Sequence, residues 1–230
     1  MTSDSLWLKQ PLQEAVFDLR FSTLNDYSIF AGVISELQRD KFKVERMISG
    51  DFPIHVPGMI RHRFFNSDKS LFFQTGQDVI SVNSVTYSGF QDFIKQIESI
   101  LEPSISRYPE ISSLFRLGLT YINQFDNVKD MYSVLSLVPP SGDFALVESS
   151  TIQLNYSKKE ENNIVLSKNI NFDFDQSNLM FIINAHEDFP NGSSLNLPSI
   201  LNWINEAHTL ISESFNSLVS KSEKERRNTK

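Results

Sequence analysis

The sequence predicts an α+β fold in which a curved antiparallel or mixed sheet carries three main helices. Segments with alternating apolar residues follow one another with few helices between them, which is typical of sheets with helices on one face. The 230 residues are 40% hydrophobic and include 19 Phe, enough apolar material for a substantial core. Both halves of the sequence end in strands followed by a helix, so two similar halves are one interpretation.

The first half is expected to begin with a strand and a helix. Apolar residues alternate with Glu14, Asp18 and Arg20 over residues 13–21, the pattern of a half-buried strand. Apolar residues then recur at helical spacing and predict a first helix over residues 27–42. Three short apolar segments separated by turn residues follow and predict an antiparallel meander. These segments are residues 61–65, 71–74 and 79–85.

A second helix and one further strand are expected next. Ser88 and Gln91 have the spacing of a capping box, and an apolar stripe follows them. Pro103 is expected to end this helix, because proline cannot continue the hydrogen-bond ladder. Alternation over residues 115–121 then predicts a strand that carries Arg116 on its polar side.

The second half is expected to hold three strands, a loop at residues 189–192 and one long helix. Pro198 fits the first turn of this helix, which is predicted over residues 198–220. The three strands are predicted at residues 144–156, 164–174 and 179–184.

These elements suggest a division of the chain. Residues 1–125 form an N-terminal α+β half, and residues 144–220 form a C-terminal half of three strands and a helix. Residues 126–143 contain a Pro-Pro pair and are interpreted as the connection between the halves. Residues 221–230 carry many charges and no apolar anchor, so they predict a disordered tail.

Composition and charge limit the classes of function. The formal net charge is −7, which argues against a nucleic-acid partner and suits a basic protein partner. The chain has no Cys, which excludes disulfides, thiolate metal sites and cysteine nucleophiles. The phosphate-loop, dinucleotide-binding and nucleophile-elbow motifs do not occur in the sequence. We therefore expect a non-enzymatic protein with no cofactor and no catalytic residue.

The sequence also bears on location. Residues 1–10 show no basic region followed by an apolar run, as a secretory signal would. No segment approaches the 18 apolar residues of a membrane span. The expectation is a cytoplasmic protein without a membrane partner.

One alternative is a metal-dependent nuclease or hydrolase. Asn171, Asp173 and Asp175 alternate and would share one face of a strand, where two carboxylates can bind Mg²⁺ or Mn²⁺. In this alternative Asp173 and Asp175 hold the metal. The competing interpretation is that the phenylalanines between them face the core and the acids face water.

A basic and aromatic strand is a further candidate. Arg61-His62-Arg63-Phe64-Phe65 combines cations with rings, as nucleic-acid-binding sheets do. Within an acidic chain, a solvated sheet face is the favoured interpretation of this one strand.

His208 lies on the apolar stripe of the last predicted helix. A single histidine on such a face is usually a hydrogen-bonded core residue. The alternative is a small-ligand sensor with a pocket between the sheet and this helix, near His208 and Arg116.

Two arginines form another candidate site. Arg20 and Arg116 lie on strands whose opposite faces are strongly apolar. If these strands are neighbours, two guanidinium groups would form a patch for an anion or a carboxylate. The favoured alternative is that the arginines form salt bridges with Glu14 and Asp18.

Several motifs resemble those of a sporadically distributed bacterial protein family of unknown function. The most specific are the opening P-x-x-E-A-V-F-x-L-R-F and the central R-x-G-L-x-Y-I-N. A tryptophan often found in the family near the start of the second helix is Phe90 here. The matching segments are residues 11–21, 73–76, 82–83, 87, 90, 116–123, 172–175, 207–208 and 215.

The resemblance implies a stand-alone module with the scattered occurrence of mobile or defence-associated genes. We therefore expect an accessory or antitoxin-like protein-interaction module. Its expected partner is another protein encoded nearby, with a homo-oligomer as a second option. Polar residues at the motif positions are the candidate binding residues, and some of them could instead be buried groups that fix the sheet. They are Glu14, Arg20, Asn83, Arg116, Tyr121, Asn123 and His208.

Overall fold

A computed structural model of the chain describes residues 11–47, 56–137, 151–160, 162–173 and 175–228. The strands are β1 (Leu12–Phe21), β2 (Lys43–Arg46), β3 (Ile60–Phe65), β4 (Leu71–Gly76), β5 (Val79–Ser84), β6 (Ser113–Asp126), β7 (Thr151–Lys159), β8 (Val165–Asp173) and β9 (Asn178–Ser194). The helices are α1 (Tyr27–Leu37), α2 (Phe90–Arg107), α3 (Met131–Val134), α4 (Leu197–Leu218) and α5 (Lys221–Asn228), with a 3₁₀ turn at Pro109–Ser112.

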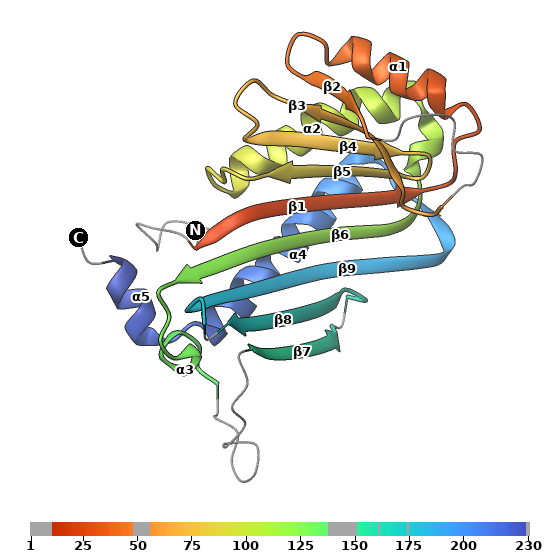
Figure 1. Cartoon of the computed structure of the whole chain (residues 1–230). Helices are drawn as coiled ribbons and strands as arrows, with labels where there is room; N and C mark the ends of the chain where they lie inside the picture. Colours follow the sequence, from red (N-terminus) through yellow and green to blue (C-terminus); the bar gives the residue numbers. More distant parts are fainter. Residues whose placement is uncertain (1–10, 48–55, 138–150, 161, 174, 229–230) are drawn as a thin grey trace. The chain divides into compact units, whose positions relative to one another are not determined.

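The described strands form one open antiparallel sheet in the order β2-β3-β4-β5-β1-β6-β9-β8-β7 (Figure 1). The α+β class predicted from the sequence is therefore confirmed. None of the helices in the described ranges is long and apolar enough to cross a membrane.

The chain divides into two compact units, each built from several segments. This division differs from the expected one, because both units combine residues from the two halves of the sequence. Unit 1 comprises Met1–Gln13, Thr120–Ala185 and Ala207–Lys230, and unit 2 comprises Glu14–Leu119 and His186–Glu206.

Unit 2 contains the predicted antiparallel meander, which is confirmed. Strand β3 pairs with β4, and β4 pairs with β5. Strand β1 joins the other side of β5, with Phe17 opposite Val82. Helices α1 and α2 lie on one face of these strands (Figure 1), where Phe17, Phe73 and Phe93 are almost completely buried. Burial of large aromatic side chains supplies much of the apolar stabilisation of this unit.

The start of α2 differs from the expectation. Gly89, not Ser88, is the N-cap residue, and no side chain caps the helix. The capping box predicted from Ser88 and Gln91 is therefore wrong. Gly89 has a φ of 125°, a conformation that favours glycine, so a backbone turn sets this end of the helix.

The predicted end of α2 is also wrong, because the helix continues through Pro103 to Arg107. A proline inside a helix leaves the carbonyl one turn earlier without its usual N–H donor. Here that carbonyl belongs to Ser99, and it accepts a hydrogen bond from Nε2 of Gln38 at 3.3 Å. Gln38 is only 5% exposed, so a buried amide from the segment after α1 replaces the missing donor.

Three further elements differ from the expected bounds. Helix α1 ends at Leu37, and the chain then forms the short strand β2, which the sequence analysis missed. Strand β9 continues through the predicted loop at residues 189–192 as far as Ser194. The backbone N–H of Leu195 bonds to the carbonyl of Ser112 at 3.1 Å, beside the start of β6. The first residues of the predicted strand at 144–156 lie outside the described residues.

In unit 1, the C-terminal part of α4 packs against the buried side chains of β6 and β9. The rings of Phe181 and Phe215 stack with their centroids 6.1 Å apart. Strand β8 pairs with β9 on one side and with β7 on the other. Alternate residues of β8, among them Leu166, Ile170 and Phe172, are buried, as expected for a strand with one covered face.

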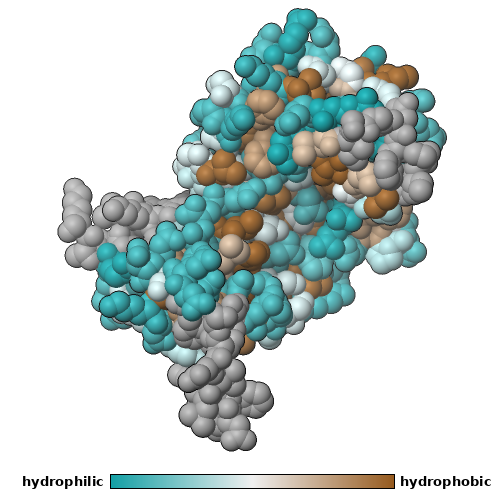
Figure 2. Space-filling view, viewed as in Figure 1, coloured by the Kyte–Doolittle hydropathy of each residue, from teal (hydrophilic) through white to brown (hydrophobic). Residues whose placement is uncertain are grey.

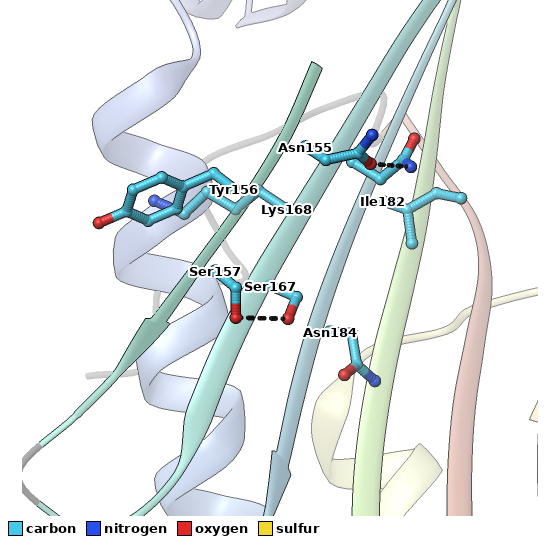
Figure 3. Close-up of a pocket in the computed structure, with 8 residues that line it drawn as sticks. Asn155, Tyr156, Ser157, Ser167, Lys168, Ile182 and Asn184 are labelled. Atoms are coloured by element: carbon cyan, nitrogen blue, oxygen red, sulfur yellow. Dashed lines mark hydrogen bonds between the residues drawn. The ribbon is translucent and has the colours of Figure 1, made fainter. Parts of the chain in front are cut away.

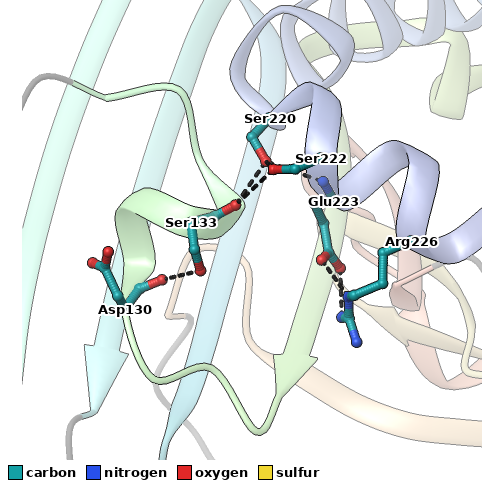
Figure 4. A network of polar contacts seen from close by, with 6 residues as sticks. All are labelled: Asp130, Ser133, Ser220, Ser222, Glu223 and Arg226. Atoms are coloured by element: carbon teal, nitrogen blue, oxygen red, sulfur yellow. Dashed lines mark hydrogen bonds and ion pairs between the residues drawn. The ribbon is translucent and has the colours of Figure 1, made fainter.

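Helix α5 begins after Ser220, where the sequence analysis expects a disordered tail. The Ser220 hydroxyl accepts a hydrogen bond from the backbone N–H of Glu223 and donates one to the carbonyl of Ser133 in α3 (Figure 4). The Glu223 carboxylate is 4% exposed and accepts two hydrogen bonds from Arg226, at 2.7 and 2.8 Å. Ser220 and Glu223 have the S-x-x-E spacing of a capping box, which explains why a helix restarts here.

Candidate functional site

The seven candidate binding residues do not form one group. Tyr121, Asn123 and His208 belong to unit 1. The other four belong to unit 2. They are Glu14, Arg20, Asn83 and Arg116.

The unit 1 residues form hydrogen bonds inside the core. Tyr121 Oη lies 2.8 Å from Nδ1 of His208, and the two residues are 7% and 5% exposed. Asn123 donates from Nδ2 to the carbonyl of Phe181 at 3.2 Å, and it is 4% exposed. Buried polar groups that bond to one another in this way fix the position of a helix on a sheet.

The unit 2 residues lie on the sheet face opposite helices α1 and α2, which we call the open face. On β1 the buried residues point toward the helices, so Glu14, Asp18 and Arg20 point to the open face. Arg116 of β6 and residues of β9 lie near Asp18 on the same face. Over the strands, Figure 2 shows hydrophilic residues beside hydrophobic ones. We define the open-face cluster as Glu14, Asp18, Arg20, Asn83, Arg116, His186 and Asp188.

Asp18 is a half-buried acid of the open-face cluster. Burial raises the pKa of its carboxyl group, while the charges of Arg116, Arg20 and His186 act in the opposite direction. Gly118 makes room for this carboxyl group, because a Cβ atom at that position would lie 2.4 Å from Oδ1 of Asp18. The R-x-G-L motif therefore has a steric reason for its glycine, which lies against an acid of the segment that carries the opening motif.

Within the open-face cluster, Arg116 and His186 both lie close to Asp188. Arg116 Nη1 lies 3.4 Å from Oδ1 of Asp188, and the two side chains are 31% and 54% exposed. His186 Nε2 lies 3.8 Å from Oδ2 of the same aspartate. Burial and the charge of Arg116 lower the pKa of His186, which favours the neutral imidazole at neutral pH. With a neutral imidazole at His186, Asp188 forms its ion pair with Arg116.

The remaining members of the open-face cluster are held by neighbouring polar groups. Asn83 donates from Nδ2 to Oε1 of Glu14 at 2.8 Å, on adjacent strands. The guanidinium group of Arg20 lies against Gly58, where a Cβ atom would come within 3.1 Å of it. Both carboxylate oxygens of Asp78 accept the N–H of Gly58, at 2.9 and 3.1 Å. Arg116 pairs with Asp188, and Glu14 accepts a hydrogen bond from an amide. The charges of Arg116 and Arg20 both act on Asp18, the other acid of the expected salt bridges.

The basic, aromatic strand β3 divides its residues between the two faces. His62 points toward α1, with Nδ1 2.8 Å from Oη of Tyr27. The guanidinium group of Arg63 lies 5.1 Å from the ring centroid of Phe72 on the adjacent strand. These are contacts within the protein, and the nucleic-acid interpretation of this strand gains no further support from them.

Asp173 and Asp175 do not share a strand face, because β8 ends at Asp173 and Asp175 lies in the following turn. Oδ1 of Asp173 accepts the backbone N–H of Gln176 at 2.9 Å, as an aspartate does when it stabilises a turn. Among the described residues, no three His, Asp or Glu side chains lie close enough together to hold a metal ion.

The sequence analysis did not include Asp18, His186 and Asp188 among the binding candidates. Asp18 was expected only as a salt-bridge partner, and His186 and Asp188 lie between the strand predicted at residues 179–184 and the loop predicted at residues 189–192. The alternation of β9 provides a signal, because Leu179, Phe181, Ile183 and Ala185 are buried. If the strand continues past Ala185 with the same alternation, His186 and Asp188 lie on the face opposite these buried residues.

Comparison with known proteins adds no assignment. No protein-family model, curated protein or solved structure matches the chain.

Proposed function

We propose that this chain is a non-enzymatic protein-interaction module that binds its partner through the open-face cluster of unit 2. The observation that supports this function is the Arg116–Asp188 pair, which is long at 3.4 Å and partly exposed. Such a surface pair contributes little to stability, so exchanging it for a partner's charged groups costs little. Charges of this kind mainly set the specificity and rate of association.

The chemistry of the open-face cluster also favours binding over catalysis. Its half-buried acid, Asp18, lies near two arginines and a histidine that belong to the chain itself. A partner could place a basic group against Asp188 and an acidic group against Arg116, so that both charges are paired in the complex. The net charge of −7 adds a general attraction for a basic protein.

The resemblance to the bacterial family extends this proposal. We propose an accessory or antitoxin-like role in a bacterial defence or mobile-element operon, a cytoplasmic location and a partner encoded nearby. A duplication of two similar halves, with three main helices on the sheet, belongs to the same set of proposals. Each of these rests on sequence motifs and composition.

The two alternative functions have less support. The ligand sensor needs polar groups that face a pocket, whereas Tyr121 and His208 bond to each other in the core. The metal-dependent enzyme needs Asp173 and Asp175 to converge, whereas Asp173 stabilises a turn. A thermal-shift screen with Mg²⁺, Mn²⁺ and Zn²⁺ tests the second alternative, and stabilisation by any of the three would revive it.

The proposed function is tested by comparing the wild-type chain with a charge-reversed variant in the capture of a partner from the native host. Asp188→Arg should lose the partner that the wild-type chain captures, because it places two positive groups together. Glu98→Arg makes the same charge change at an exposed position of α2 and should capture the partner normally. Failure of the wild-type chain to capture any protein, or equal capture by Asp188→Arg, would contradict the proposal.

A further inference from the structure

Two strands end the sheet order within the described residues, and they differ in character. Strand β2 has four residues, of which Lys43, Glu45 and Arg46 are charged. Short, charged edge strands resist pairing with other chains. Strand β7 has nine residues and pairs with β8 in nine consecutive positions without a register shift. It therefore has none of the bulges that disrupt an edge.

The central residues of β7 have no protective features. Residues 153–157 contain no charge, no glycine and no proline. Leu154 and Tyr156 project from one face and are 42% and 54% exposed. A long, regular edge with exposed apolar side chains is a template for a further strand.

On the other face, the central residues of β7 are neutral and polar. Asn155 bonds to Asn169, and Ser157 bonds to Ser167, both across to β8 (Figure 3). On the face of Leu154 and Tyr156, the same view shows the ring of Tyr156 beside Lys168, whose Nζ is 5.3 Å from the ring centroid. A strand added to β7 would extend an apolar row on one face and a polar row on the other.

We propose that β7 pairs antiparallel with β7 of a second copy of this chain, with Asn155 at the two-fold axis. Asn155 is the middle residue of the strand, so this register alone pairs all nine residues. It places Leu154 opposite the second copy's Tyr156, and Gln153 opposite the second copy's Ser157. A two-fold pair makes each of these contacts twice.

The charges of β7 agree with this register. Lys158 and Lys159 lie at one end of the strand, and they fall opposite positions 152 and 151 of the second copy. Those positions are Ile and Thr, so no two like charges face each other. Directly opposed aromatic and aliphatic residues stabilise a strand pair, and like charges destabilise it. In this register the strand is thus complementary to itself in polarity, and it opposes no like charges.

This proposal concerns unit 1 and is independent of the open-face cluster, so the two can fail separately. Its first test is the mass of the chain in solution, measured by sedimentation equilibrium. The wild-type chain should be a dimer. A Lys variant (Leu154→Lys with Tyr156→Lys) and a Glu variant (Leu154→Glu with Tyr156→Glu) should each be monomeric, because each places like charges opposite each other.

An equal mixture of the Lys and Glu variants should restore a dimer, because Lys then faces Glu in every pair. Circular dichroism should show both variants folded, since the substituted side chains are about half exposed. A monomeric wild-type chain would overturn the proposal. This is also the result expected if residues 138–150 of the same chain, or another protein, cover β7. A dimer that persists in both variants would overturn it as well.

The second test fixes the register and uses the absence of native cysteine. Directly opposed residues in an antiparallel pair have Cα atoms about 4.5–5.5 Å apart, which suits a disulfide. Asn155→Cys should therefore form a cross-linked dimer on mild oxidation. In Ser157→Cys, on the same face, the two thiols would be about 14 Å apart along the strands and should not cross-link. The reverse pattern, or no difference between the variants, would overturn the register.

Discussion

Gly118→Ala is expected to destabilise the fold through its contact with Asp18. The added methyl group would lie 2.4 Å from Oδ1 and 2.9 Å from Cγ of Asp18. Ordinary van der Waals contact begins near 3.4 Å, so the carboxylate has to move by about 1 Å. Overpacking of this kind costs about 1–3 kcal/mol. Replacing a strand glycine gains roughly 0.5–1 kcal/mol, so the net loss of folding stability should be up to about 2.5 kcal/mol.

Urea unfolding of matched variants measures this effect. Gly32→Ala in helix α1 is the control, because nothing lies within 4 Å of its added methyl group. This control should gain up to about 1 kcal/mol, the usual advantage of alanine over glycine in a helix. Adding Asp18→Ala to Gly118→Ala should recover part of the loss, because it removes the clash. Equal stability of the two alanine variants, or strict additivity in the double variant, would refute the steric argument.

Three further variants test other parts of the structure. Gln38→Ala should lower the free energy of unfolding by about 0.5–1.5 kcal/mol, because it removes the hydrogen bond that the Ser99 carbonyl accepts. Thermal unfolding should show a lower midpoint. An unchanged midpoint would contradict this role of Gln38. Tyr121→Phe should lower the free energy of unfolding by about 1–3 kcal/mol, because it removes the 2.8 Å hydrogen bond to His208 in the core. Denaturant unfolding measures this loss. An unchanged free energy of unfolding would mean that the hydrogen bond is dispensable. Asp18→Asn should become more stabilising relative to the wild type as pH rises. Burial raises the pKa of Asp18 above 3.8, so the folded state favours the protonated acid, and the associated stability is lost as pH rises through the folded pKa. Unfolding curves from acid to neutral pH measure this trend, which would be contradicted by a constant difference between the two proteins.

The strands of unit 2 were predictable because their signals are local. Alternation over β1 and turn residues between β3, β4 and β5 are sufficient to predict a meander, and both patterns are present in the sequence. The end of α2 was not predictable in this way. Pro103 is tolerated because Gln38, more than sixty positions earlier in the chain, supplies a donor to Ser99. A contact between such distant residues leaves no local pattern.

The candidate site was predictable in part for the same reason. Arg20 and Arg116 were expected to form a patch only if their strands were neighbours. Strands β1 and β6 are adjacent in the sheet, and both arginines lie near Asp18. The acid that pairs with Arg116 is Asp188, which lies four residues beyond the end of the strand predicted at residues 179–184. Because β9 extends to Ser194, His186 and Asp188 are strand residues with defined faces. The period of two predicts a face only when the length of the strand is known.

Native mass spectrometry of the chain isolated from its host tests the central proposal most directly. Our account predicts a species heavier by the mass of another polypeptide, and this species should be absent for Asp188→Arg and present for Glu98→Arg. A second copy of the chain bound through β7 would add its own known mass and should persist in both variants. The account would be contradicted by a chain that carries only a metal ion or a small molecule, retained by the wild type and lost with Asp188→Arg.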